Sequence, residues 1–105
     1  RLLGEGRELV VWNRSAERAA PLLAAGATLA ATPADVARGA DLVFSMIRDD
    51  AAATEVYEGR HGFLSAPVEG RLFVEMSTLR PATITRLDAS LRARGAALVD
   101  APVSG

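Results

Sequence analysis

The 105-residue chain carries twelve basic and thirteen acidic residues, and half of its residues are apolar. This size allows one domain with one core, and the balanced charge excludes the basic footprint of a nucleic-acid-binding protein. The absence of cysteine excludes disulfides and thiolate metal sites, and His61 alone cannot form a zinc site. No apolar run reaches the ~20 residues of a membrane helix, so we expect a cytoplasmic protein without nucleic-acid or membrane partners.

The first elements predicted along the chain are a strand, a helix and a second strand. The apolar run at 9–12 is rich in β-forming residues and is typical of a buried parallel strand. Ser15 suits a helix N-cap, and the helix would continue to about Ala25. Gly26 then suits the position after its end, and 28–30 is a short strand.

A second helix begins with a strong local signal. Thr32 is suited to the N-cap, Pro33 to the first helical position and Asp35 to the third. This short helix would stop near Gly39, and the apolar residues 42–46 follow as the next strand.

The rest of the chain continues the alternation of helices and strands. We expect a helix at 51–57, a strand at 72–76, a helix at 81–94 and a short strand at 97–99, with Asp100 opening the final loop. The helix at 81–94 is the clearest because its apolar residues recur at helical spacing; they are Ile84, Leu87 and Leu91.

This alternation predicts an α/β fold with a doubly wound parallel sheet and right-handed crossovers. We expect all five strands to lie in one sheet, so that residues 1–105 form one partial dinucleotide-binding domain. Gly4 and Gly6 resemble the end of a helix that enters the strand at 9–12. The chain would thus start inside a helix, and the strand preceding that helix would lie upstream.

Four polar or small-residue loops follow predicted strands. In open parallel sheets, ligands bind beyond the carboxyl ends of the strands. These loops are therefore the candidate binding site, and they comprise residues 13–15, 47–49, 77–78 and 101–105.

Arg14 carries the most specific signal among these loops. In dinucleotide-binding folds an arginine near the end of the second strand accepts the 2′-phosphate of NADP, and its forked donors suit phosphate. The alternative is a solvated loop residue. For Asp49 and Asp50, a role at a helix N-terminus is more common than a catalytic carboxylate pair, and Trp12 suits either the core or a pocket wall.

Four segments resemble the β-hydroxyacid dehydrogenase family, which includes 3-hydroxyisobutyrate dehydrogenase, tartronate semialdehyde reductase and the NADP-binding domain of 6-phosphogluconate dehydrogenase. The segments occur in the family's order and spacing, and the resemblance covers essentially all 105 residues. They are LVVWNRS, GATLAATPADVARGADLVFSMI, VEMSTLRP and LVDAPVSG.

The resemblance implies a Rossmann-like domain that binds NADP in preference to NAD. The cofactor-binding residues that it implies are Asn13, Arg14, Ser15, Met46, Ile47, Arg48 and Thr78. The first three would hold the adenosine end, Met46 and Ile47 would line the channel toward the nicotinamide, and Thr78 would lie near the nicotinamide ribose. Many relatives have Leu-Pro at 47–48, so Arg48 is a departure that could add a phosphate contact.

The resemblance also implies parts that lie outside these residues. Ser104 and Gly105 would bind the carboxylate of a small substrate, whereas the glycine-rich loop, the catalytic lysine and a helical oligomerisation domain would lie beyond the two ends. The chain contains no lysine. No catalytic residue is therefore assigned here, and the 105 residues alone are expected to be inactive.

Three other functions remain open. Imine reductases share this architecture and an arginine after the second strand, although they usually lack the PVSG loop. A dehydrogenase-like module without catalysis would serve binding or oligomerisation, and the catalytic lysine that would decide this lies outside the sequence. A methyltransferase of similar fold fits the pattern of strands and helices but not the resemblance.

Overall fold

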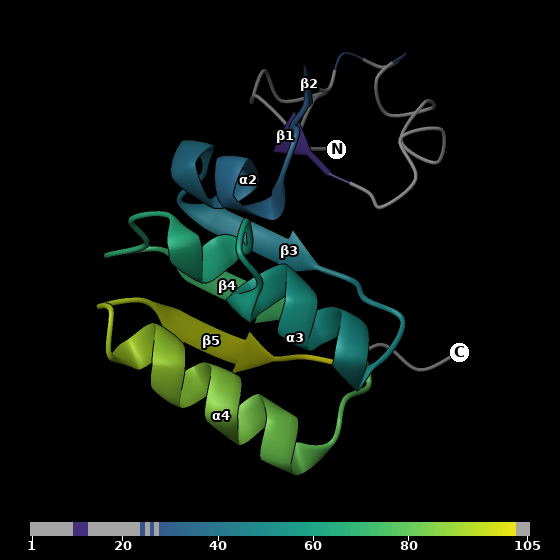
Figure 1. Cartoon of the computed structure of the whole chain (residues 1–105), viewed down its shortest axis with the longest axis vertical. Coiled ribbons are helices and arrows are strands. Elements are labelled where there is room, and N and C mark those ends of the chain that lie inside the picture. The colour runs from purple at the N-terminus through teal and green to yellow at the C-terminus, as the bar shows by residue number, and fades with distance from the viewer. Residues whose placement is uncertain (1–9, 13–23, 25, 27, 103–105) are drawn as a thin grey trace.

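Five parallel strands form two sheets in the computed structural model, which describes residues 10–12, 24, 26 and 28–102. The smaller sheet pairs β1 (Val10–Val11) with β2 (Thr28–Leu29). The larger sheet has the order β3-β4-β5 and contains β3 (Leu42–Ser45), β4 (Leu72–Glu75) and β5 (Ala97–Asp100). The two sheets lie side by side, with β1 and β2 beyond the β3 edge (Figure 1).

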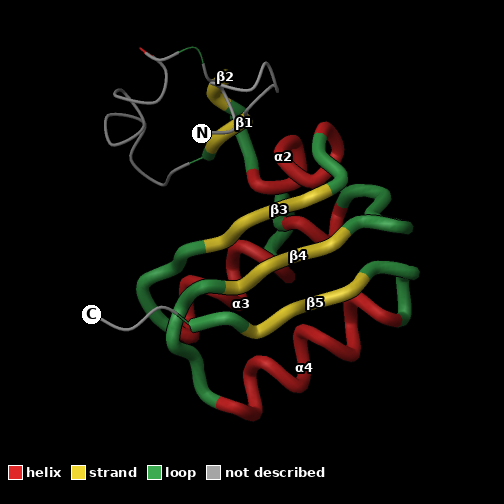
Figure 2. Tube along the Cα trace, turned by 180° about the vertical axis from the view of Figure 1, so that it is seen from behind, coloured by secondary structure: helices red, strands yellow, loops and turns green. Residues whose placement is uncertain are grey.

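Helices cover one face of the larger sheet. Figure 2 shows α3 (Asp50–Glu58) and α4 (Pro81–Arg92) behind the three strands. Val43 and Phe73 are buried on that face, whereas Phe44 points to the other face and is 53% exposed. The alternation follows from the two-residue period of a strand, and it leaves an apolar sheet face without a helix among the described residues.

An aromatic cluster holds the helices to the sheet. The rings of Phe63 and Phe73 lie 5.1 Å apart, and the ring of Tyr57 meets that of Phe63 edge-on at 4.9 Å. Phe63 belongs to the short 3-10 helix η3 (Phe63–Ser65). Leu87 and Leu91 of α4 are fully buried in the same core. Together these side chains fix α3, α4 and β4 as one packed unit.

Hydrogen bonds close both ends of α2 (Pro33–Gly39). The hydroxyl of Thr32 accepts a hydrogen bond from the backbone N–H of Asp35 at 3.2 Å, as expected for an N-cap threonine. At the other end, the guanidinium of Arg71 donates to the carbonyls of Ala37 and Arg38 at 2.6 and 3.1 Å. A cation is favourable at this end of the helix dipole.

The α/β parallel fold predicted from the sequence is confirmed, and the described helices and strands lie within about two residues of their predicted ranges. Two details were wrong: α4 ends at Arg92, and Asp100 pairs with Glu75 as the last residue of β5. The predicted helix from Ser15 to Ala25 lies almost entirely outside the described residues. None of the described helices is long and apolar enough to cross a membrane.

The prediction of one continuous sheet was wrong for the described strands, because no described strand lies between β1 and β3. A doubly wound sheet has the order 3-2-1-4-5-6. In that order β2 and β1 occupy the places of strands 3 and 2, and β3, β4 and β5 occupy those of strands 4, 5 and 6. The place between the two sheets is therefore that of strand 1.

Candidate functional site

The described part of the predicted site lies at the carboxyl edge of the larger sheet. Strands β3 and β4 are parallel neighbours, so the segments that follow them leave the sheet side by side. These segments carry the four described candidates for cofactor binding: Met46, Ile47, Arg48 and Thr78. The other candidates, Asn13, Arg14, Ser15, Ser104 and Gly105, lie outside the described residues.

The segment after β3 presents different groups to solvent and to the core. The side chain of Met46 is 66% exposed, and that of Arg48 is 82% exposed, with its Nε 3.6 Å from the Asp49 carboxylate. Ile47 is half-buried and packs against the hydrophobic core. The resemblance implies a place for Ile47 along the cofactor channel, and the structure shows in addition that its side chain contacts the core.

Hydrogen bonds tie the ends of the three strands together. The backbone N–H of Met76 donates to the carbonyl of Ser45 at 2.8 Å, and that of Ala101 donates to the carbonyl of Glu75 at 2.9 Å. The N–H of Ile47 donates to the hydroxyl of Ser77. The candidate residues therefore stand on backbone segments that are fixed against one another.

A buried carboxylate lies directly beneath this edge. Glu75, the last residue of β4, is 0% exposed. Its Oε1 accepts a hydrogen bond from the Tyr57 hydroxyl at 2.7 Å, and its Oε2 accepts one from the Ser77 N–H at 3.1 Å. Burial, together with the nearby Glu75 carboxylate, raises the pKa of Tyr57 far above its ordinary value, so the phenol stays a proton donor.

Neither Glu75 nor Tyr57 is among the site residues predicted from the sequence. A signal was present, because Glu75 is the one charged residue in the otherwise apolar run 72–76. A glutamate inside such a strand must find partners when the strand is buried.

The aspartates that follow β3 serve the helices rather than a catalytic pair. Asp49 caps α3, because its carboxylate accepts a hydrogen bond from the Ala52 N–H at 2.8 Å. Asp50 reaches the start of α4 and accepts a hydrogen bond from the Arg80 N–H at 3.0 Å. Hydrogen bonds from Thr83 and then from Arg80 lower the pKa of Asp50, as expected when they stabilise the ionised form.

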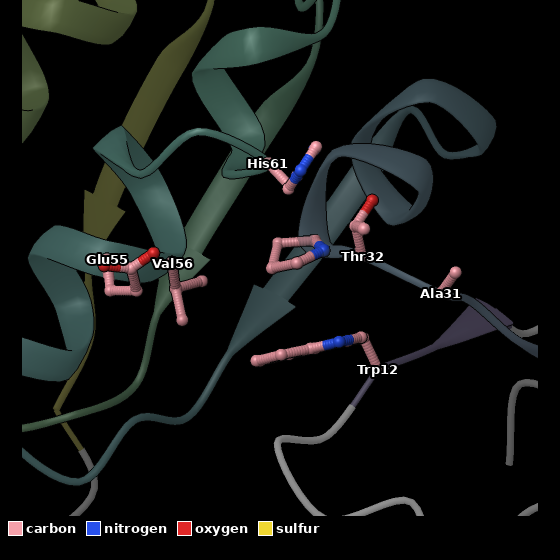
Figure 3. A pocket seen from close by; sticks show the side chains of 7 residues that line it. Trp12, Ala31, Thr32, Glu55, Val56 and His61 are labelled. Carbon is pink, nitrogen blue, oxygen red and sulfur yellow. The ribbon is translucent and has the colours of Figure 1, made fainter.

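A recess of about 180 Å³ lies between β1, α2 and α3. Trp12, which directly follows β1, reaches across it toward Val56 of α3, and Thr32 and His61 border its other side (Figure 3). Trp12 also packs against the core, so it serves both of the roles that the sequence left open. The volume is below the 300–1,000 Å³ of a complete ligand pocket, so the recess could hold only part of a dinucleotide.

The residues at the edge of β3 and β4 fit a dinucleotide in their chemistry. The exposed thioether of Met46 offers an apolar surface for a ring, and the exposed Thr78 offers a hydroxyl for a ribose. The neighbouring carboxylates of Asp49 and Asp50 are engaged in helix hydrogen bonds. The described edge therefore combines apolar contact with a few polar groups, as ligand sites do.

Residues 1–105 match the family described as the NAD binding domain of 6-phosphogluconate dehydrogenase. The chain belongs to this family. Its resemblance to the β-hydroxyacid dehydrogenases, inferred from the four segments, is thereby confirmed at the level of the cofactor-binding domain.

A relative and two solved structures give the range of proteins to which this domain is similar. The cytokine-like nuclear factor N-PAC of Danio rerio is 41% identical over 99% of this chain, which spans only 22% of that protein. A structure described as Psf3 in complex with NADP+ and 2-OPP has a TM-score of 0.87 and 31% identity, over 99% of this chain and 37% of that one. An imine reductase from a Pseudomonas species has a TM-score of 0.77 and 26% identity, over 92% of this chain and 33% of that one.

Proposed function

We propose that this chain is the cofactor-binding part of an NADP-dependent oxidoreductase, which transfers hydride between NADP(H) and a small β-hydroxyacid or its aldehyde or keto form. The observation that carries the proposal is the convergence of the segments after β3 and β4 at one sheet edge, in a chain whose whole length matches an NAD-binding domain family. Ligands of doubly wound folds bind at such an edge.

The preference for NADP rests on the three residues that follow Trp12. Asn13, Arg14 and Ser15 can all donate hydrogen bonds, and none of them is acidic. A carboxylate at this position would repel the 2′-phosphate, whereas a guanidinium would bind it. The solved relative described with NADP+ is consistent with this assignment.

The cofactor would supply the hydride, and this chain's residues would bind and orient it. Met46 would contact a ring, Thr78 would bind the nicotinamide ribose and Arg48 would add a phosphate contact. Ser104 and Gly105 would hold the carboxylate of the substrate. A general acid must lie within hydrogen-bond reach of the substrate oxygen. The resemblance assigns this role to a lysine, and these 105 residues contain no lysine. We therefore expect the 105 residues alone to be inactive. For the whole protein we propose a homo-oligomer in the cytoplasm.

A turnover assay on the whole protein tests the reaction class. The oxidation of NADPH would be followed with small aldehyde acids and, separately, with cyclic imines. Turnover with the carboxylate-bearing aldehydes supports the proposal. Turnover with imines alone would assign the imine-reductase function, for which the structural similarity to the Pseudomonas enzyme is the supporting observation.

A non-catalytic role is the second candidate. The similarity to N-PAC, whose name describes a nuclear factor, favours it. A whole protein that binds NADPH but turns over neither aldehyde acids nor imines would have this role.

A further inference from the structure

Glu75 occupies the central place in the larger sheet. It is the last residue of the middle strand, in register with Ser45 of β3 and with Asp100 of β5. Its side chain is fully buried on the helix-covered face. It can therefore reach the layer of helices and the strand ends at the same time.

A buried carboxylate at this place is not explained by stability alone. None of the ion pairs among the described side chains includes Glu75; its partners are the Tyr57 hydroxyl and the Ser77 N–H. Desolvation of a carboxylate is costly, and replacement of buried charged groups by well-packed apolar residues is often neutral or stabilising. The two hydrogen bonds that Glu75 accepts hold the groups that it joins in a defined geometry, as buried polar networks can.

The two carboxylate oxygens of Glu75 accept hydrogen bonds from two different parts of the chain. Oε1 is held by Tyr57 of α3, and Oε2 holds the backbone of Ser77 in the segment after β4. The Ser77 hydroxyl in turn accepts the N–H of Ile47 in the segment after β3. One continuous chain of hydrogen bonds thus runs from α3 through Glu75 to both segments.

This chain ends next to the exposed candidates for cofactor contact. Ile47 directly follows Met46, and Ser77 directly precedes Thr78. Ser77 is itself buried, so its backbone has little freedom to move independently of Glu75. The hydrogen bonds through Glu75 and Ser77 therefore help to fix the separation between Met46 and Thr78, together with the bond from the Met76 N–H to the Ser45 carbonyl.

We propose that Glu75 is a positioning residue, which fixes the segments after β3 and β4 so that Met46 and Thr78 receive the nicotinamide half of the cofactor. This inference rests on the proposed function, since it names how part of the same site is held. The inference adds one expectation to the proposed function. Binding of the adenosine half, which is assigned to residues 13–15, should not depend on Glu75.

The test compares two ligands in the whole protein. The dissociation constants of NADPH and of adenosine 2′,5′-bisphosphate, which represents the adenosine half alone, would be measured by calorimetry for Glu75→Gln and Ser77→Ala. Glu58→Gln and Ser65→Ala are matched controls, because Glu58 hydrogen-bonds to Arg86 and Ser65 to Gly62, away from the carboxyl edge. Thermal melts would show that each variant is folded.

We expect both test variants to weaken NADPH about tenfold, corresponding to the loss of one positioning hydrogen bond, and to leave bisphosphate binding within about twofold. Ser77→Thr retains the hydroxyl and should restore NADPH binding. The controls should change neither constant. If Glu75→Gln does not fold, Ser77→Ala and Ser77→Thr carry the test.

Two results in the variants would overturn the inference alone. Unchanged NADPH binding in the folded variants would show that the hydrogen bonds do not position the site, and equal weakening of both ligands would show a general structural role. A wild-type protein that binds neither ligand would instead overturn the proposed function, and the inference with it.

Discussion

Phe73 is one of the largest fully buried side chains of the core. It is fully buried, and the rings of Tyr57 and Phe63 both lie against it. Truncation of a buried phenylalanine leaves a cavity that packed neighbours cannot fill.

We predict that Phe73→Ala lowers the free energy of unfolding by about 3–5 kcal/mol. Urea denaturation of the 105-residue chain measures this change. Phe44→Ala is the matched control, because Phe44 is 53% exposed on the other face of the sheet and its truncation should cost much less. Equal losses for the two variants would contradict the packing described here.

The preference for NADP that we propose rests on one side chain, that of Arg14. A charge-assisted hydrogen bond to a phosphate is worth about 1.5–3 kcal/mol, which corresponds to a roughly tenfold to hundredfold preference in binding. We predict that Arg14→Ala weakens NADPH much more than NADH and that Arg14→Asp reverses the preference.

Titration of both cofactors into the wild-type protein and the two Arg14 variants measures this preference. Equal weakening of NADPH and NADH would show that Arg14 contacts a group common to both, such as the adenine. Arg92→Ala is the control, because its exposed guanidinium lies near the end of α4, outside the candidate loops, and it should change neither constant.

Among the contacts between helices and strands, Asp50 connects the helices α3 and α4. It is the first residue of α3 and binds the backbone at the start of α4. Because its pKa is lowered in the folded protein, its contribution to stability is present above the unfolded value of about 4. This contribution disappears as the pH falls through the lowered folded pKa.

We predict that Asp50→Asn lowers the melting temperature at pH 7 and that the difference from the wild-type protein shrinks as the pH falls below about 4. Melting curves between pH 2 and pH 7 measure this trend. Asp41→Asn, at an exposed aspartate, is the control and should give a much smaller difference at pH 7. A difference for Asp50→Asn that stays constant down to pH 2 would rule out the ionised contact.

The elements that the sequence predicted well are those with local signals. The start of α2 follows from Thr32, Pro33 and Asp35, whose interactions span three residues. The strands follow from short apolar runs, which burial in a parallel sheet requires.

The network around Glu75 could not be predicted in the same way. It joins Tyr57 to Glu75 and Ile47 to Ser77, across separations of 18 and 30 residues. Only the packing of α3 on the sheet and the pairing of β3 with β4 bring these residues together. The division into two sheets is also non-local, because it depends on which strand lies between β1 and β3. Local propensity contains neither kind of information.

One face of the larger sheet carries no helix among the residues that the structure describes. Phe44, Leu42 and Met46 alternate along and just beyond β3 on this face, and each is more than a third exposed. Parallel sheets are normally covered on both faces, and contiguous exposed apolar surface marks a contact.

We predict that the 105-residue chain binds a hydrophobic dye such as ANS and that Phe44→Lys reduces the dye fluorescence. Val43→Ala is the control, because Val43 is buried on the opposite face and its truncation should not reduce dye binding. Fluorescence that is equal for the wild-type chain and Phe44→Lys would show that the dye binds elsewhere.

The measurement that tests the central claim most directly is the binding of NADPH and NADH to the whole protein by calorimetry. We expect one NADPH to bind per chain, at least about tenfold more tightly than NADH. Absence of binding for both cofactors would contradict the assignment of this chain as a cofactor-binding domain, and a preference for NADH would contradict the role given to Arg14.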